Sequence, residues 1–171
     1  MDFRSLLTEL PSGTERDLLI GEIMNSDEHV ETLLRLALHD KDPIAWRACW
    51  LLDGSDERKP GLVQKHLPRI IRALEGLQSK GTLRSLLRLL TRYPIPEEEQ
   101  GLLIDCCFAY LVSGQYPVAV KAHAMQIIYN HVLIYPELKH ELIAVIEDQA
   151  GNNSVGFRAR GNMLIKQMEK L

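Results

Sequence analysis

Cysteine is scarce in this sequence, and long apolar runs are missing. The three cysteines, two of them adjacent at Cys106 and Cys107, do not form the spaced, even set of a disulfide framework. They suit a reducing compartment, and the N-terminal stretch MDFRSLLTELPSG lacks the positive start and apolar core of a signal peptide. No stretch approaches the roughly 18 apolar residues that a membrane span needs. The sequence therefore predicts a soluble, cytoplasmic protein.

The common motifs of catalysis are also missing. There is no glycine-rich phosphate loop, no GxSxG elbow and no HExxH zinc motif. His123 and His131 stand eight residues apart, about 12 Å along one helix, which is too far to share a metal ion. The three acids of PEEEQ are explained by the dipole at a helix start. We therefore expect no cofactor, no metal site and no enzymatic activity.

A helical pattern runs along the whole chain. Its 171 residues are 46% hydrophobic and 25% charged, as in an ordinary globular domain. Apolar residues recur three and four positions apart, as in EHVETLLRLALH, and no segment shows the two-residue period of a strand. Helix starts are expected at Thr14 with Asp17, at Asp42 and at Ser154. The predicted helices span 2–10, 14–25, 27–39, 43–53, 62–77, 82–92, 97–113, 117–134, 137–149 and 155–170; Pro68 predicts that the fifth kinks or begins at residue 67.

A step of 37 residues relates four triplets that each read large apolar, basic, small. The triplets are Trp46-Arg47-Ala48, Leu83-Arg84-Ser85, Val120-Lys121-Ala122 and Phe157-Arg158-Ala159. The same step carries Trp50 to Leu87, Ala124 and Gly161. Recurrence at a fixed step is typical of stacked helical hairpins, which bury together a core that none could bury alone. The two tryptophans in PIAWRACWLL are therefore predicted to be packing residues rather than a cofactor site.

The stretches DPIAWRACWLL and YPVAVKAHAMQII resemble the inner helices of HEAT repeats, in which a basic residue follows a proline within about a turn. The resemblance covers residues 27–170, and VAVKAHAMQIIY, YPELKHELIAVI and GFRARGNMLIK are also similar to small bacterial HEAT-like proteins of uncharacterised role. It implies an all-α fold, a right-handed α-α superhelix (solenoid) of about four hairpins plus N-terminal capping helices. The expected organisation is one domain over 1–171, with a cap at 1–26 and repeats near 27–53, 62–92, 97–134 and 137–170. In that family the motif helix lines the concave face.

Charge is divided unevenly along the chain, whose net charge is −3. Residues 1–42 contain four basic and ten acidic residues, whereas the motif helices 43–53, 82–92, 117–134 and 155–171 together carry a net +7. If those helices form one layer, their basic side chains line up along it. We call this predicted set the basic strip; it consists of Arg47, Arg84, Arg88, Lys121, Arg158 and Arg160. A strip of one sign attracts a partner of the other sign, so the sequence predicts a protein interaction module that binds an acidic segment of another protein.

Two alternatives stay open at this stage. The basic side chains can instead bond turn carbonyls or acids of the next repeat, or lie in water. The same face can also bind nucleic acid, since DNA-alkylation-repair glycosylases are HEAT-like proteins that use tryptophans and an aspartate on the concave face. Trp50 and Asp53 resemble that pair, although they are three residues apart where the family has four. The sequence predicts no membrane partner and does not specify an oligomeric state.

Overall fold

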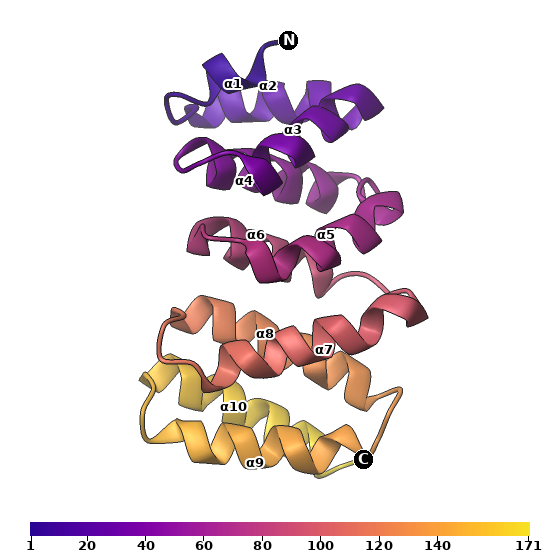
Figure 1. Cartoon of the computed structure of the whole chain (residues 1–171), viewed down its shortest axis with the longest axis vertical. Coiled ribbons are helices and arrows are strands. Elements are labelled where there is room, and N and C mark those ends of the chain that lie inside the picture. Colours follow the sequence, from indigo (N-terminus) through magenta and orange to yellow (C-terminus); the bar gives the residue numbers. More distant parts are fainter. The chain divides into compact units, whose positions relative to one another are not determined.

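The computed structural model describes all 171 residues, which form helices and no strand (Figure 1). The all-α prediction is confirmed, and each of the ten predicted helices has its counterpart. The α-helices are α1 (Phe3–Leu6), α2 (Gly13–Met24), α3 (Asp27–His39), α4 (Ile44–Arg58), α5 (Leu67–Ala73), α6 (Lys80–Leu90), α7 (Glu97–Val112), α8 (Val118–Val132), α9 (Leu138–Ala150) and α10 (Val155–Met168). Two short 3-10 segments, η1 (Gln64–His66) and η2 (Leu74–Gly76), flank α5.

Three helices differ most in length from their predicted ranges, and the first of them, α1, spans only Phe3–Leu6 instead of 2–10. The α-helical part of the fifth begins at Leu67 because Pro68 lacks a backbone N–H and is tolerated only in the first turn. By contrast, α4 runs five residues beyond the predicted end at Asp53 and stops at Arg58. The extra turn is held by polar residues that are buried and bonded, such as Ser55, whose hydroxyl donates to the Leu51 carbonyl at 2.7 Å.

Serine side chains cap several helix starts. Ser154 accepts a hydrogen bond from the Phe157 N–H, as the sequence predicted. The predicted start of α2 at Thr14 is wrong by one residue, because Ser12 and Glu15 form a reciprocal capping box and α2 begins at Gly13.

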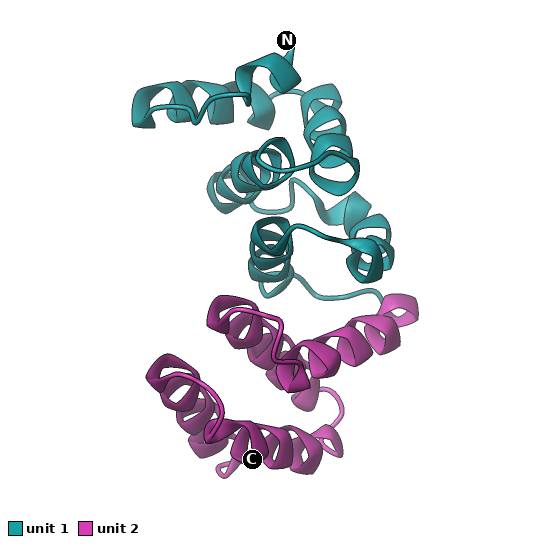
Figure 2. Cartoon of the chain, turned by 60° about the vertical axis from the view of Figure 1, so that its left-hand side comes forward, with its two compact units in different colours: residues 1–96 teal, residues 97–171 magenta.

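The chain divides into two compact units after Pro96 (Figure 2). Unit 1 spans residues 1–96 and contains α1 to α6; unit 2 spans residues 97–171 and contains α7 to α10. Within unit 1, α4 packs against α2, α3 and α6. Within unit 2, α8 packs against α7, α9 and α10. The predicted single domain over 1–171 stays a prediction.

The motif helices of each unit lie side by side and run in the same direction. In unit 1 the start of α6 touches the start of α4, since a Cβ placed on Gly81 would lie 3.0 Å from the Trp46 Cβ. Further along, Arg88 of α6 reaches Asp53 of α4. In unit 2 the same order holds for α8 and α10: Lys121 reaches Asn153, two residues before α10 begins, and Gln126 meets Arg160 of α10. This arrangement brings the residues of one repeat column next to each other within a unit.

The core follows the repeat columns. Leu83, Val120 and Phe157 are buried, as their shared column predicts. In the second column the side chain shrinks to glycine at Gly161, where an added Cβ would lie 2.5 Å from the Ile146 Cγ2 of α9. The first members of both columns, Trp46 and Trp50, are only half-buried, which the columns alone did not indicate. None of the helices combines the length and the apolar composition that a bilayer crossing requires.

Candidate functional site

Arg47, the first residue of the basic strip, is bonded to backbone carbonyls. Its Nη1 donates to the carbonyl oxygens of Leu7 at 3.0 Å and Thr8 at 2.7 Å. These carbonyls follow α1, at the place where a helix leaves its last acceptors unpaired. These hydrogen bonds of Arg47 therefore connect the segment after α1 to the start of α4.

Arg88 is bonded to two acids of α4. Its Nη1 lies 2.6 Å from Asp53 Oδ2, and its Nη2 lies 2.9 Å from Glu57 Oε1. The hydrogen bond that Arg88 donates to Asp53 is the main reason why the pKa of Arg88 is raised above its ordinary value. Arg92, two residues after the end of α6, donates to Asp53 Oδ1 at 2.8 Å and to Asp56 Oδ2 at 2.9 Å.

The acids at the centre of this network are buried. Asp53 is 6% exposed and Asp56 is 2% exposed. Tyr93 completes the network, because its hydroxyl donates to Asp56 and accepts from the Gly61 N–H at 3.1 Å. Burial, together with the Asp56 carboxylate, raises the pKa of Tyr93 to about 12. Both oxygens of Asp53 are occupied by arginines, so this aspartate joins α4 to α6 and does not face a substrate.

In unit 2 the three residues of the basic strip are bonded within the unit. Lys121 is 3% exposed and donates to Asn153 Oδ1 at 3.0 Å, and burial lowers the pKa of its ammonium group. Arg158 is exposed, and its Nη1 donates to the Asn153 carbonyl at 2.8 Å. Arg160 donates to Gln126 Oε1 at 2.5 Å. Partner binding by these three side chains stays a prediction.

Arg84 differs from the other five members of the basic strip. Its side chain is exposed and forms no hydrogen bond or ion pair within the chain. It stands three residues after Gly81 and four before Arg88, so all three share one face of α6. Because Gly81 touches Trp46 and Arg88 binds Asp53, Arg84 lies beside the stretch of α4 that carries the two tryptophans.

The two tryptophans form a pair on the half-exposed side of α4. Their ring centroids are 6.4 Å apart with an interplanar angle of 55°. The Arg16 guanidinium of α2 lies over the Trp50 ring at 4.4 Å, and the Arg47 guanidinium lies over the Trp46 ring at 5.5 Å. Each indole thus carries a cation on its face.

Arg16 packs directly on the backbone of α4 next to Trp50. An added Cβ at Gly54 would lie 2.3 Å from Arg16 Nη2, so the absence of a side chain at Gly54 makes the room for this guanidinium. Arg16 makes no hydrogen bond through its side chain, and its Nε is buried without a partner. Sequence reasoning missed Arg16, because it precedes the repeats and belongs to no column.

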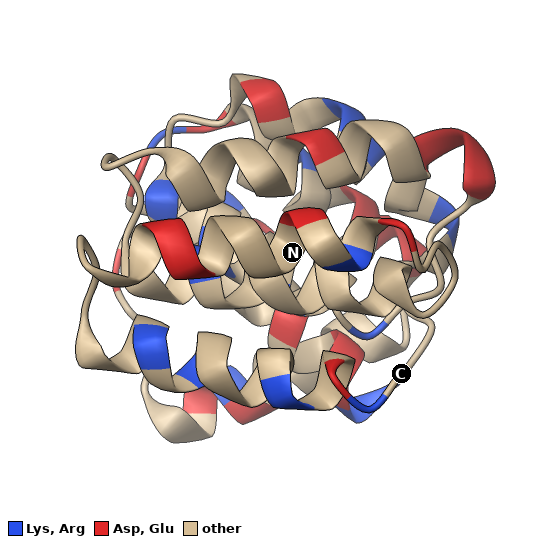
Figure 3. Ribbon diagram, turned by 90° about the horizontal axis from the view of Figure 1, so that it is seen from below, with Lys and Arg blue, Asp and Glu red and all other residues tan.

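We call Arg16, Trp46, Trp50 and Arg84 the tryptophan–arginine face. It belongs wholly to unit 1, with one residue from α2, two from α4 and one from α6. Basic and acidic residues are both spread over the helices (Figure 3), and most of the basic ones in unit 1 have an acidic or carbonyl partner. The face stands out because both of its arginines have unused N–H donors.

The structure contains no cluster of metal-binding side chains and no accessible cysteine thiol. No three histidine, cysteine or acidic side chains are placed to hold a metal ion. Cys49, Cys106 and Cys107 are buried free thiols. Burial raises the pKa values of Cys49 and Cys107, which keeps both thiols protonated and unreactive.

Stacked helical hairpins with parallel motif helices define a helical-repeat protein. A family model of the HEAT repeat domain matches residues 3–168, and the chain belongs to the HEAT repeat family. HEAT repeats generally mediate protein–protein interaction, and the family generally supplies non-enzymatic scaffolds. Comparison with curated proteins and with solved structures gives no match.

Proposed function

We propose that this protein is a non-enzymatic interaction module and that its tryptophan–arginine face binds an acidic segment of another protein. The observation that carries the proposal is the pair of arginines, Arg16 and Arg84, whose guanidinium groups have no hydrogen-bond acceptor within the chain. Guanidinium groups bind carboxylates with two parallel hydrogen bonds, so a ligand with acidic side chains supplies the missing acceptors.

The tryptophans supply the apolar part of the contact. Half-buried indoles are rigid and offer a large area at a small cost in side-chain entropy, which is why tryptophan and arginine are enriched at binding hot spots. Packing alone would bury the first members of both columns, as it buries Leu83 and Leu87 one repeat later. The exposure of Trp46 and Trp50 therefore favours a partner that covers them.

The surrounding charge favours a short acidic segment over a nucleic acid. A nucleic acid carries a negative charge on every nucleotide, and its binding depends on neutralising many of them. The face offers two free cations, and residues 1–42, which include α2 and α3, hold ten acidic residues against four basic ones. A long polyanion would be repelled by this neighbourhood, whereas one or two carboxylates can be placed on the arginines.

The test uses Arg84→Glu in the full chain. Arg84 is exposed and unbonded, so reversing its charge leaves the fold and the melting temperature nearly unchanged. Immobilised wild-type chain captures partners that are identified by mass spectrometry, and the bound segment is then made as a peptide. Trp46 and Trp50 are the two tryptophans of the chain, so their fluorescence reports binding at the face directly.

We expect Arg84→Glu to weaken the peptide about tenfold or more, because a like charge then opposes its carboxylates. The matched control is Arg35→Glu, which makes the same charge change at an exposed position of α3, and it should bind as the wild type does. Equal binding by wild type and Arg84→Glu would refute the proposal. Binding of a single-stranded oligonucleotide with a steep salt dependence would favour the nucleic-acid alternative instead.

A further inference from the structure

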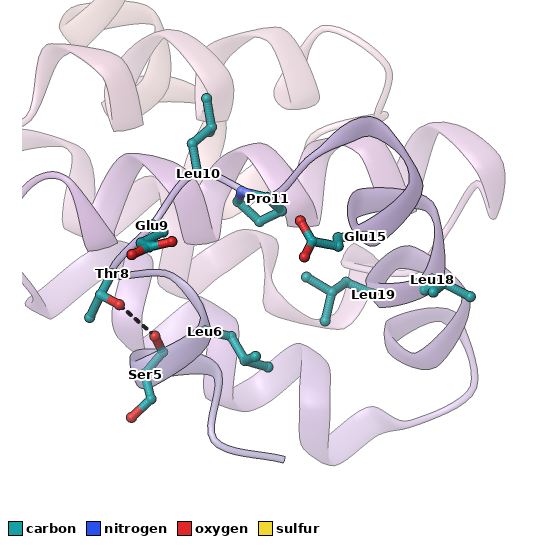
Figure 4. A pocket seen from close by; sticks show the side chains of 9 residues that line it. All are labelled: Ser5, Leu6, Thr8, Glu9, Leu10, Pro11, Glu15, Leu18 and Leu19. Carbon is teal, nitrogen blue, oxygen red and sulfur yellow. Dashed lines mark hydrogen bonds between the residues drawn. The ribbon is translucent and has the colours of Figure 1, made fainter.

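The N-terminal helices form an open groove of about 400 Å³ in unit 1, lined by leucines and by polar side chains (Figure 4). Leu6 of α1 and Leu19 of α2 point toward one another across it, and Pro11 also lines it. Three leucines at or beside the groove are strongly exposed, namely Leu6 at 46%, Leu10 at 55% and Leu18 at 69%. Exposed apolar groups gathered at one place mark an interaction surface more often than leucines scattered singly do.

Two carboxylates give the groove a negative rim. Glu9 is exposed and has no bonding partner within the chain, and Glu15 lines the groove while it closes the capping box of α2. The segment 1–42 around them carries a net −6, from four basic and ten acidic residues. The groove therefore fits a segment that combines apolar and basic side chains.

α10 of the same sequence presents such a segment. Val155 and Met163 are exposed at 71% and 41% on this helix. Its basic residues Arg158 and Lys166 are exposed as well, and residues 155–171 carry a net +3. Val155, Ala159, Met163 and Lys166 follow one another at spacings of three and four, so they form one stripe of the helix.

The repeat columns show that this stripe differs from its counterparts in α4 and α6. Two steps of 37 residues before Met163 stands Leu89, and three steps before it Leu52. Leu89 is 1% exposed and Leu52 is fully buried, whereas Met163 is 41% exposed. Ala159 shows the same contrast, because it is exposed where Ala48 is fully buried. α10 thus exposes a face that α4 and α6 bury.

We propose that the groove between α1 and α2 receives the Met163 stripe of α10 from a second copy of this chain, so that copies associate head to tail. Met163 enters between Leu6 and Leu19, and the basic residues of α10 meet the acidic rim. Different surfaces of the two copies are in contact, so the interface is heterologous. This contact is separate from the tryptophan–arginine face and does not depend on it.

Two double variants of the full chain test the proposal. The groove variant is Leu6→Lys with Glu9→Lys, and the stripe variant is Met163→Glu with Lys166→Glu. All four positions are exposed, so circular dichroism and melting temperature should match the wild type. Sedimentation velocity over a hundredfold range of concentration measures the mass. We expect the wild-type mass to rise with concentration above the 19.5 kDa of one chain, and each variant alone to remain at 19.5 kDa.

Mixing the two variants gives the decisive result. The groove variant keeps an intact stripe and the stripe variant keeps an intact groove, so an equal mixture should regain complexes of two chains. Glu28→Lys, an equivalent charge change at an exposed position of α3, should associate as the wild type does. A wild type that stays at 19.5 kDa throughout overturns the proposal. Self-association of either variant alone at wild-type strength also overturns it, because a symmetric interface would then be at work.

Discussion

The Arg88 guanidinium of α6 lies 2.6 Å from the carboxylate of Asp53 on α4, and this ion pair joins two successive repeats. The side chain of Asp53 is 8% exposed, whereas that of Glu57, the second acid on Arg88, is 56% exposed. The two acids share one cation but differ in solvation. Water screens the outer pair far more than the inner one.

Asp53→Asn should therefore lower the free energy of unfolding by about 2–3 kcal/mol. The substitution removes a buried charge that holds both Arg88 and Arg92, and hydrogen bonds to charged groups are worth more than neutral ones. Glu57→Gln is the matched control and should cost about 0–1 kcal/mol. Urea titration of both variants measures the difference. Equal costs would show that burial of Asp53 does not strengthen the network.

The close packing of Ile146 against Gly161 leads to a second prediction. A methyl group there would lie 2.5 Å from Ile146 Cγ2, so Gly161→Ala should destabilise the protein by about 1–3 kcal/mol through overpacking of α9 against α10. Gly101 in α7 has no neighbour within 4 Å of an added Cβ, and Gly101→Ala should stabilise by about 0.5–1 kcal/mol, the usual gain within a helix. Thermal unfolding of the two variants gives opposite shifts; shifts of the same sign would contradict the steric argument.

The sequence predicted the helices and the repeats better than it predicted the roles of the basic residues. Helix periodicity is local, and the 37-residue step placed Leu83, Val120 and Phe157 correctly in the core. The bonding of a charged side chain depends on what neighbouring helices bring to it. Arg47 and Arg84 occupy the same column, yet one binds two carbonyls after α1 and the other faces solvent. That difference arises from tertiary packing, which a column does not encode.

The role of Arg16 could not be predicted from the repeat columns either. It belongs to the cap, and its contact with Trp50 depends on how α2 crosses α4. The local signal that pointed there was Gly54, a glycine one turn after Trp50 inside a helix. A glycine in a helix interior costs stability and so often marks a close approach, but the sequence does not say which group approaches.

His66 predicts a pH dependence of stability. Its side chain is 14% exposed, and burial lowers the pKa of the imidazole below the ordinary value of 6.5. As the pH falls through 6.5, the unfolded chain binds a proton that the folded chain resists, so the free energy of unfolding falls. One such proton changes stability by at most about 1.4 kcal/mol per pH unit.

Replacing the imidazole of His66 should reduce this fall in the free energy of unfolding at low pH. We expect the stability of His66→Gln to change less than that of the wild type between neutral pH and pH of about 5, as measured by urea titration at several pH values. His140→Gln, at an exposed position of α9, should follow the wild-type curve. A wild-type curve that His66→Gln reproduces in full would show that other groups cause the acid sensitivity.

Substitutions of Trp46 can distinguish its contribution to packing from its contribution to binding at the tryptophan–arginine face. Trp46→Ala should cost about 2 kcal/mol, less than the 3–5 kcal/mol of a fully buried aromatic residue, because the indole is only half-buried. Trp46→Leu introduces the side chain that the next repeat carries at Leu83, and it should lower the free energy of unfolding by about 1 kcal/mol or less.

The leucine variant keeps the contact with Gly81 but loses the indole. It should therefore fold normally, as judged by its melting temperature, and bind the acidic peptide more weakly, as judged by the remaining fluorescence of Trp50. Normal binding by this variant would assign Trp46 to packing alone, as its repeat column first predicted.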